Sequence, residues 1–276
     1  MSLKLFYITT EITPFANTYS LADFSAKVPL ALQTMGHDVR TMLPKYGFVS
    51  QRKYILREVI RLREIPFTFD GKDQMASAKS AFIPKTRVQV YFLEHDHWLK
   101  PLTNLLYKSK NGRVLADNSD RYSFYANASI ATLPHLFWKP DILLCNDWQS
   151  SVIPAVYKQL YADQDFYKDI KTVVLIHSLD EYSKFEVDAY KKSGLDLEKI
   201  LGKKKKINGF EIAVEFADAV VVLDDAKKKL SQKIMKLESF KKAKKKLTLI
   251  QGADTENPDH HQLAASLNET LQKLSS

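Results

Sequence analysis

Residues 3–24 read LKLFYITTEITPFANTYSLADF, and the pattern of this stretch indicates the class of fold. Residues 3–9 are apolar or β-prone, which is typical of a strand. Apolar side chains then recur at the three- and four-residue spacing of one helix face, at Leu21, Phe24, Val28, Leu32 and Met35. A strand that runs into a helix is the repeating unit of α/β proteins, and the turn between them usually meets a phosphate-bearing ligand.

The turn itself, residues 17–20, has an unusual composition for a phosphate loop. Such turns normally use Gly, because Gly lets the backbone approach the ligand, and they often carry a Lys. Here Tyr19 and Ser20 stand where Gly is expected, and Asn17 stands where Lys would be useful. The turn therefore has the position of a ligand loop without the usual chemistry.

The same alternation continues along the chain. Strands are predicted at residues 38–43, 141–145, 172–176, 219–223 and 247–250, and helices at residues 118–133, 149–161, 210–216, 225–240 and from 261 onward. Continuous apolar strands between helices favour a parallel sheet covered on both faces. We therefore predict an α/β, Rossmann-like, doubly wound and mostly parallel sheet. No repeat or linker interrupts it, so residues 1–276 are expected to form a single domain.

Three other regions are expected to differ from this alternation. Residues 54–93 contain three β-like runs joined by turn-prone residues, which predicts a small antiparallel excursion. Residues 100–118 and 178–206 are expected to be irregular.

The overall composition is that of an ordinary globular protein. Hydrophobic residues make up 45% and charged residues 26% of the chain, and a single cysteine, Cys145, excludes an intramolecular disulfide. No apolar run approaches the roughly 20 residues of a membrane span. The N-terminus lacks the basic and apolar regions of a signal peptide. A cytoplasmic protein without a membrane association is therefore expected.

The net charge of +9 is concentrated in residues 191–246, which hold 17 Lys, 8 Asp or Glu and no Arg. Runs of lysine are usually solvated helix faces and loops. The alternative is a basic patch for a polyanion or an acidic partner. Nucleic acid is disfavoured as that partner, because the window has no Arg, few aromatic residues and no known reader motif.

Several motifs resemble one protein family. GHDVR at residues 36–40 and LPKYG at residues 43–47 resemble the early signature of bacterial glycogen synthases and plant starch synthases. WKPDI at residues 138–142, followed by CNDWQ at residues 145–149, is more specific, because it is similar to a family strand that runs into an active-site turn. Further matches follow in family order at residues 117–122, 176–177, 216–218 and 251–254.

The resemblance implies a glycosyltransferase with the GT-B fold, in which two Rossmann domains face each other across a cleft. Such enzymes transfer glucose from ADP-glucose or UDP-glucose to an α-1,4-glucan. The sequence ends soon after residues 251–254. We therefore expect the acceptor-side, N-terminal half of a GT-B fold, without the C-terminal nucleotide-sugar domain.

The resemblance also indicates candidate site residues. Asp147 and His177 are candidate catalytic residues, and the candidate substrate-binding residues are Asp147, Trp148, His177, Asp23 and Asn17. Each has a structural alternative: Asp147 as the cap of a helix that begins near residue 149, His177 as a hydrogen-bonded structural histidine, and Trp148 as core packing. Residues 94–97 read EHDH, but neighbouring side chains of an extended chain point apart. No metal and no cofactor are therefore expected.

Departures from the family pattern argue against catalysis. The family loop KTGGLADV is here NTYSLADF, so Asn17 replaces a lysine, and Tyr19 and Ser20 replace two glycines. Asp180 and Glu181 enter the loop after residues 176–177, where negative charge would repel a diphosphate. Transfer from a nucleotide sugar depends on stabilising charge, and losing one such interaction costs on the order of 3 kcal/mol.

The expected function is therefore that of a glycogen synthase-related protein that is inactive alone. It would bind α-glucan, maltooligosaccharide or a protein partner, including a second copy of itself, through the exposed cleft face. One alternative is half of a split synthase that is active with a separate C-terminal domain. The other is a purely structural or regulatory interaction protein.

Overall fold

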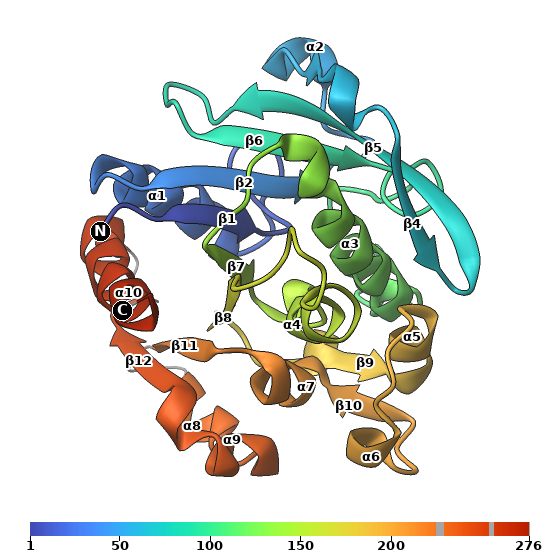
Figure 1. The fold of residues 1–276 in the computed structure, drawn as a ribbon, viewed down its shortest axis with the longest axis vertical. Helices are drawn as coiled ribbons and strands as arrows, with labels where there is room; N and C mark the ends of the chain where they lie inside the picture. The colour runs from blue at the N-terminus through green and yellow to red at the C-terminus, as the bar shows by residue number, and fades with distance from the viewer. Residues whose placement is uncertain (225–228, 254–256, 276) are drawn as a thin grey trace.

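The computed structural model describes residues 1–224, 229–253 and 257–275, and its centre is a sheet of ten described strands (Figure 1). The strands are β1 (Lys4–Ile8), β2 (Asp38–Pro44), β3 (Arg57–Glu58), β4 (Ile65–Phe69), β5 (Lys72–Phe82), β6 (Gln89–Glu94), β7 (Ile142–Asn146), β8 (Lys171–Ile176), β11 (Ala219–Asp224) and β12 (Leu247–Gln251). Their order is β12-β11-β8-β7-β1-β2-β6-β5-β3, and β4 pairs with β5. All neighbours from β12 to β6 are parallel, which confirms the predicted Rossmann-like sheet.

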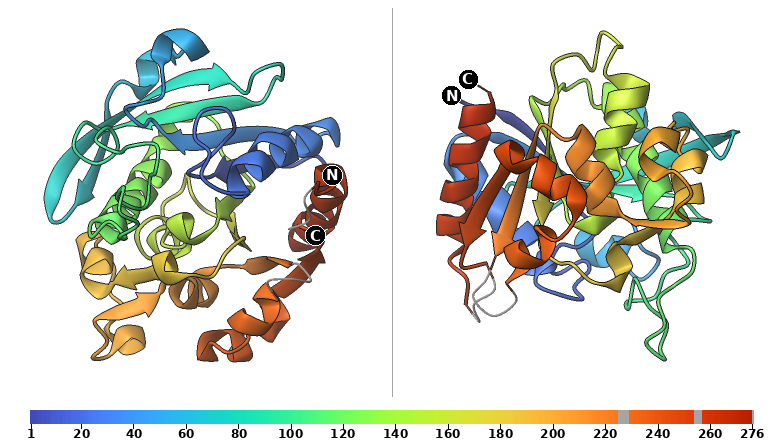
Figure 2. Two further views of the ribbon diagram at one scale, coloured as in Figure 1. Left: turned by 180° about the vertical axis from the view of Figure 1, so that it is seen from behind. Right: turned by 90° about the horizontal axis from the view of Figure 1, so that it is seen from below.

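Helices cover both faces of the sheet (Figure 2). The helices α1 (Leu21–Thr34) and α10 (His260–Leu274) pack on one face, where Phe24, Leu263 and Leu267 share a core with β1, β7 and β8. The other face is covered by α3 (Asn118–Thr132), α4 (Ile153–Val156) and α7 (Gly209–Phe216). Every residue of β7 and β11 is buried, as expected for strands that lie between two helical layers.

The antiparallel excursion expected at residues 54–93 is present and is formed by β3, β4, β5 and β6. β5 is antiparallel to β6, and β4 returns along β5 as a hairpin that packs against α3. β6 also pairs in parallel with β2, so it belongs to the main sheet as well. The short helix α2 (Gln51–Tyr54) precedes this region.

Two predicted elements are wrong in part. Residues 178–206 are not wholly irregular, because they contain β9 (Lys184–Glu186), α5 (Val187–Lys192) and α6 (Glu198–Leu201), and β9 pairs with β10 (Lys206–Asn208). The helix predicted at residues 149–161 is divided into a 3₁₀ turn, α4 and a π-helical turn (Tyr157–Tyr161). These elements depend on tertiary contacts, which local propensity does not report.

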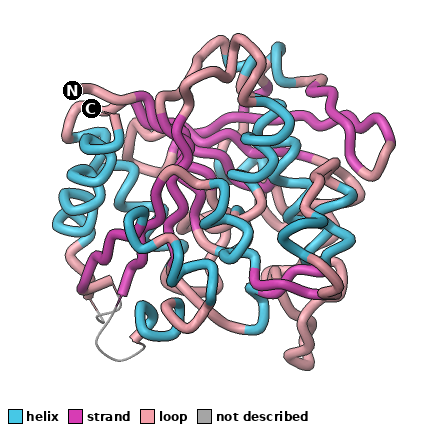
Figure 3. The backbone as a smooth tube through the Cα atoms, turned by 60° about the horizontal axis from the view of Figure 1, so that its bottom comes forward, coloured by secondary structure: helices cyan, strands magenta, loops and turns pink. Residues whose placement is uncertain are grey.

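The basic helix predicted at residues 225–240 is replaced by two short helices, α8 (Leu230–Ile234) and α9 (Glu238–Lys242). Leu237 has extended backbone between them, which ends the first helix before the second begins. Residues 225–228 and Asp254 of the 251–254 motif lie outside the described residues. Figure 3 shows the twisted main sheet in magenta, with the β9–β10 pair as a separate, smaller sheet.

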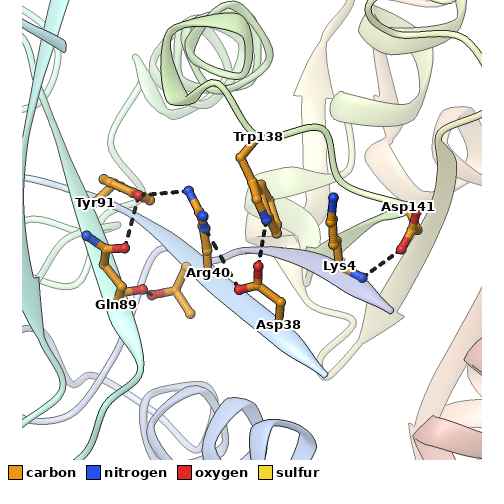
Figure 4. A network of polar contacts seen from close by, with 8 residues as sticks. Lys4, Asp38, Arg40, Gln89, Tyr91, Trp138 and Asp141 are labelled. Carbon is orange, nitrogen blue, oxygen red and sulfur yellow. Dashed lines mark hydrogen bonds and ion pairs between the residues drawn. The ribbon is translucent and has the colours of Figure 1, made fainter. Parts of the chain in front are cut away.

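The amino ends of the strands are held by a polar network (Figure 4). The Trp138 indole Nε1 donates to Asp38 Oδ2 at 2.7 Å, and the Arg40 guanidinium lies 4.4 Å from the centre of the Trp138 ring. Asp141 Oδ2 accepts from the Lys4 backbone N–H at 2.7 Å, which joins β1 to the start of β7. These residues of the 36–40 and 138–142 motifs therefore hold the sheet together at its amino edge.

Candidate functional site

A cavity of about 670 Å³ lies at the opposite, carboxyl edge of the sheet. It is lined by the loops that follow β1, β6, β7 and β8 and by the start of α8 after β11. The carboxyl ends of parallel strands meet at one edge, which is where open α/β sheets bind ligands. The cavity is therefore in the position that the strand order predicts for a site.

The loop after β1 is fixed by a buried carboxylate, Glu11. Its side chain accepts hydrogen bonds from the Thr18 backbone N–H, from Thr18 Oγ1 at 2.6 Å and from the Tyr107 hydroxyl at 2.7 Å. Burial raises the pKa of Glu11, and the hydrogen bonds from Thr18 and Tyr107 oppose this. Because Tyr107 belongs to the loop after β6, Glu11 joins two walls of the cavity. No motif in the sequence marks this residue as part of a site.

Tyr19 lines the cavity at a position where the related motif has glycine. Its hydroxyl donates to Asp147 Oδ2 at 2.6 Å and accepts from Gln149 Nε2 at 3.1 Å. A glycine could form neither bond. The Tyr19 hydroxyl therefore connects the loop after β1 to the loop after β7. In the related motif, the glycine at this position would instead let a backbone amide face a phosphate.

Asp147 is fully buried behind Tyr19 and Ser178 and is not itself part of the cavity lining. Its carboxylate accepts hydrogen bonds from the backbone N–H groups of His177 and Ser178, both at 3.1 Å, and from Ser178 Oγ at 2.7 Å. The alternative prediction, that Asp147 caps the helix after it, is wrong, because the carboxylate faces the loop after β8 instead.

The backbone and charge of Asp147 are both perturbed. Its φ of 60° and ψ of −172° fall in a region that non-glycine residues rarely adopt, at a cost on the order of 1–3 kcal/mol. Burial raises the pKa of Asp147 to about 6, against the hydrogen bonds from Tyr19, Ser178 and His177, which lower it. Strained backbone and a shifted acid at one residue are typical of functional sites.

His177 follows β8, and its side chain lines the cavity. The imidazole packs edge-on against the Phe24 ring at a centroid distance of 4.7 Å, and its Nε2 lies 3.3 Å from Asn146 Oδ1. Burial lowers the pKa of His177 to about 3, so the ring is neutral at pH 7. His177 is therefore a residue of the cavity lining with a neutral side chain.

Aromatic side chains form one wall of the cavity. Trp148 is 2% exposed and stacks with the half-buried Tyr182, with ring centroids 6.1 Å apart and an angle of 19°. Tyr107 lies edge-on to the same indole at 5.1 Å. The indole N–H of Trp148 donates to no described residue, and because it is not among the buried polar atoms that lack a partner, it is still reached by solvent. Trp148 therefore packs in the core, as the structural alternative predicts, and also lines the cavity.

The other two predicted binding residues behave differently from each other. Asn17 lines the cavity, and its Nδ2 donates to Thr13 Oγ1 at 3.2 Å. Asp23 does not line the cavity, because it lies in the first turn of α1 and accepts from Thr13 Oγ1 at 2.8 Å. Asp23 therefore bonds within the loop and lies outside the cavity lining.

Two lysines that sequence analysis did not select also line the cavity. Lys108 belongs to the loop after β6, and Lys233 belongs to α8. Neither forms an ion pair with another described residue. The first loop lacks the family lysine, but the cavity as a whole is not without positive charge.

Other aromatic, histidine and cysteine side chains near these strands are part of the core packing. Trp98 stacks on Phe124, and His95 lies against the same ring at 4.6 Å. Cys145 is buried in β7, where burial raises the pKa of its thiol. Within the described residues, no group of His, Cys, Asp and Glu side chains could hold a metal ion, and no helix is long and apolar enough to cross a membrane.

Comparisons with known proteins agree with the motifs. The glycogen synthase of Chlorobium luteolum is 38% identical over 175 residues, which cover 63% of this chain and 36% of the relative. The glycogen synthase of Chlorobaculum parvum is 32% identical over 220 residues, which cover 79% of this chain and 45% of the relative. The chain therefore spans less than half the length of these relatives.

A solved structure has the same fold. It is the catalytic domain of starch synthase IV from Arabidopsis thaliana bound to ADP and acarbose, with a TM-score of 0.76 and 21% identity, and the match covers 91% of this chain and 52% of that one. A family model for the starch synthase catalytic domain matches residues 4–238. This chain therefore belongs to the starch synthase catalytic domain family.

Proposed function

We propose that this domain binds α-1,4-glucan chains in the cavity at the carboxyl edge of the sheet. The observation that carries the proposal is the Trp148 indole, which is almost enclosed, lines the cavity and has no acceptor for its N–H among the described residues. A sugar hydroxyl is a suitable acceptor, and the rings of Trp148 and Tyr182 offer apolar surface to the sugar. Membership of a family whose relatives are glycogen synthases makes glucan the preferred sugar polymer.

The proposal does not include glucosyl transfer by the domain alone. At the position of the family lysine, Asn17 carries no charge, and its side chain is bonded within its own loop. Tyr19 fills space where two glycine amides would approach a diphosphate, and its hydroxyl is bonded to Asp147. Oxyanion stabilisation by charged groups and backbone amides is usually the largest contribution to such reactions. The loop after β1 therefore lacks the family lysine and both family glycines.

Isothermal titration calorimetry with maltohexaose tests glucan binding. Tyr182→Ala removes the half-buried ring that stacks on Trp148 and should weaken binding about three- to tenfold, because an aromatic contact contributes about 0.5–1.5 kcal/mol. Phe137→Ala is the matched control, because this aromatic residue is 83% exposed and precedes β7 at the amino edge. Cellohexaose tests the linkage. An absence of measurable binding heat at millimolar maltohexaose would contradict the proposal.

Glucosyl transfer together with a separate nucleotide-binding domain is a second candidate. It is favoured by the arrangement of Asp147 and His177, which lie side by side at the edge where the fold places ligands. Radiolabelled ADP-glucose and a glycogen primer test it, with the domain alone and with the nucleotide-side domain of a relative added. The triple variant Asn17→Lys, Tyr19→Gly, Ser20→Gly restores the family loop. Incorporation by the unaltered chain would favour this candidate over simple binding.

A protein partner, including a second copy of this chain, is the alternative occupant of the cavity region. Analytical ultracentrifugation with and without maltohexaose distinguishes the two. A monomer that binds glucan supports a sugar site. A dimer that glucan dissociates would instead indicate that a second copy covers the cavity.

A further inference from the structure

The cavity lining includes two lysines, whose charge a neutral glucan does not need. Lys108 and Lys233 come from different loops and line the same space as Trp148 and Tyr182. Both side chains are exposed, and neither forms an ion pair with another described residue. Two unpaired cations beside an aromatic wall match a ligand that has both a sugar ring and an anionic group.

Lys108 is held in place by its neighbour in the chain. The Tyr107 side chain is buried, and its hydroxyl donates to Glu11 at 2.7 Å and bonds with Thr10 Oγ1 at 3.0 Å. The Tyr107 carbonyl accepts from Asn118 Nδ2 at 2.9 Å. These contacts fix the backbone at residue 107, so the next residue begins from a defined position at the cavity wall.

Lys233 is held through its helix. Asp224, the last residue of β11, accepts a hydrogen bond from the Leu230 backbone N–H at 2.6 Å and another from Ser231 Oγ. These bonds attach the first turn of α8 to the carboxyl end of the strand. Leu230 and Lys233 lie about one turn apart and both line the cavity. The helix therefore presents Lys233 to the site from the side opposite the loop after β1.

Other charges near the cavity limit what can bind. Asp180 is the acidic residue of the lining, and its side chain accepts from the Tyr182 backbone N–H at 2.9 Å. Glu11 and Asp147 lie behind the lining and are engaged by hydrogen bonds from Thr18, Tyr19 and Ser178. The anion is therefore expected near the two lysines and away from the wall that contains these acids.

We propose that the preferred ligand is a gluco-oligosaccharide that carries a phosphate monoester, with its phosphate between Lys108 and Lys233 and a glucose ring against Trp148 and Tyr182. This inference rests on the proposed glucan binding and names the class of glucan. A phosphate monoester has close to two negative charges at pH 7.5, which two ammonium groups complement. The positive charge that the loop after β1 lacks at Asn17 would thus be supplied by two lysines from other walls of the cavity.

Calorimetry at pH 7.5 with maltotriose, maltotriose 1-phosphate and a 6-phosphorylated maltotriose tests the inference. At least one phosphorylated form should bind about tenfold more tightly than maltotriose. The advantage should largely disappear in about 1 M salt, where the Debye length is roughly 3 Å. Lys108→Met with Lys233→Met should reduce phosphorylated maltotriose to the affinity of maltotriose. The control, Lys236→Met with Lys245→Met, removes the same charge at exposed positions outside the cavity lining and should retain the advantage.

The possible failures are distinguishable. Equal affinity for maltotriose and both phosphorylated forms would overturn this inference and leave the proposed glucan binding intact. A phosphate advantage that survives in the Lys108→Met, Lys233→Met variant would overturn the assignment to these lysines. Inorganic phosphate that competes as strongly as the phosphorylated sugar would show that the sugar contributes nothing. Binding of none of the three sugars would contradict the proposed function itself.

Discussion

The two edges of the parallel sheet use similar side chains in different ways. At the amino edge, the polar groups satisfy one another: the Trp138 N–H donates to Asp38, and Arg40 covers the indole ring (Figure 4). At the carboxyl edge, the Trp148 N–H has no acceptor among the described residues, and Lys233 has no ion-pair partner there. Completed pairs stabilise a fold, and incomplete ones beside a cavity leave capacity for a ligand.

One stretch of sequence, residues 138–149, contributes to both edges of the sheet. A single family motif can therefore contribute both to the stability of the fold and to the cavity. Residues 138–142 lie at the amino edge and residues 145–149 at the carboxyl edge, because β7 runs between them through the sheet. Trp138 and Trp148 are both nearly buried, at 6% and 2% exposed. Their difference is in the partner of the indole N–H, which is Asp38 for Trp138 and no described residue for Trp148.

Trp138→Ala is expected to have the largest effect on stability. Truncating a buried aromatic residue costs about 3–5 kcal/mol, so the free energy of unfolding in urea should fall by about that amount. Affinity for maltohexaose should be unchanged in the folded variant. Phe137→Ala, at the exposed neighbouring ring, should cost less than about 0.5 kcal/mol. If folded Trp138→Ala loses glucan binding, the two edges do not act separately.

Asp147→Asn should reveal a pH dependence that belongs to the carboxyl edge. Burial raises the pKa of Asp147 from 3.8 to about 6, so between these values the folded state holds a proton that the unfolded state releases. The resulting stabilisation is complete below pH 3.8 and is lost as the pH rises through 6. The stability advantage of the wild type over Asp147→Asn should therefore shrink by about 2–3 kcal/mol between pH 4 and pH 7.5.

Urea titrations of the wild type and Asp147→Asn at both pH values measure this difference. The low pKa of His177 changes the free energy of unfolding in the opposite direction. As the pH falls, the unfolded histidine takes up a proton while the buried ring of the folded state stays neutral. Its contribution is present in both proteins and cancels in the comparison. A difference between the two proteins that stays constant or grows with pH would show that Asp147 is not a perturbed acid.

The sequence predicts the sheet well because its strands are buried on both faces. The uninterrupted apolar run of β8 and the helical spacing of α1 are local patterns that tertiary contacts reinforce. The helix predicted at residues 149–161 is broken, and β9 and β10 are missed, because short elements depend on partners distant in the chain. The local sequence pattern contains no information about such partners.

The candidate site is predicted in part for the same reason. Asp147, Trp148 and His177 follow strands that the pattern locates, so their shared edge can be deduced. Lys108 and Lys233 belong to a long loop and to a helix with no ligand motif, and only the fold brings them together. Glu11 is a buried acid next to the first strand, and its role depends on hydrogen bonds from Thr18 and Tyr107 that the sequence does not indicate.

Tyr19→Phe should have a moderate effect that depends on the charge of Asp147. At pH 7.5 the variant loses a hydrogen bond to a buried carboxylate, which contributes about 1.5–3 kcal/mol. At pH 4 the carboxyl is protonated in the folded state, and the loss should be closer to 1 kcal/mol. Tyr182→Phe is the matched control, because the Tyr182 hydroxyl bonds to no described residue. Equal costs for the two variants at pH 7.5 would exclude the Tyr19–Asp147 bond.

Lys246→Met is expected to have the smallest effect, and it extends the comparison to the Lys-rich window. The Lys246 ammonium donates to the carbonyls of Val214, Glu215 and Ala217 at 2.9–3.3 Å, so it caps the C-terminus of α7 at the amino edge. A cation at this end of a helix contributes about 0.3–1 kcal/mol, and urea unfolding of Lys246→Met should show a loss of that size that decreases with salt. Lys245→Met removes the same charge from an exposed neighbour and should cost nothing measurable. Equal losses of stability in the two variants would mean that the change in net charge, and not the cap on α7, accounts for the effect. Lys246 would then be a solvated lysine like others of residues 191–246.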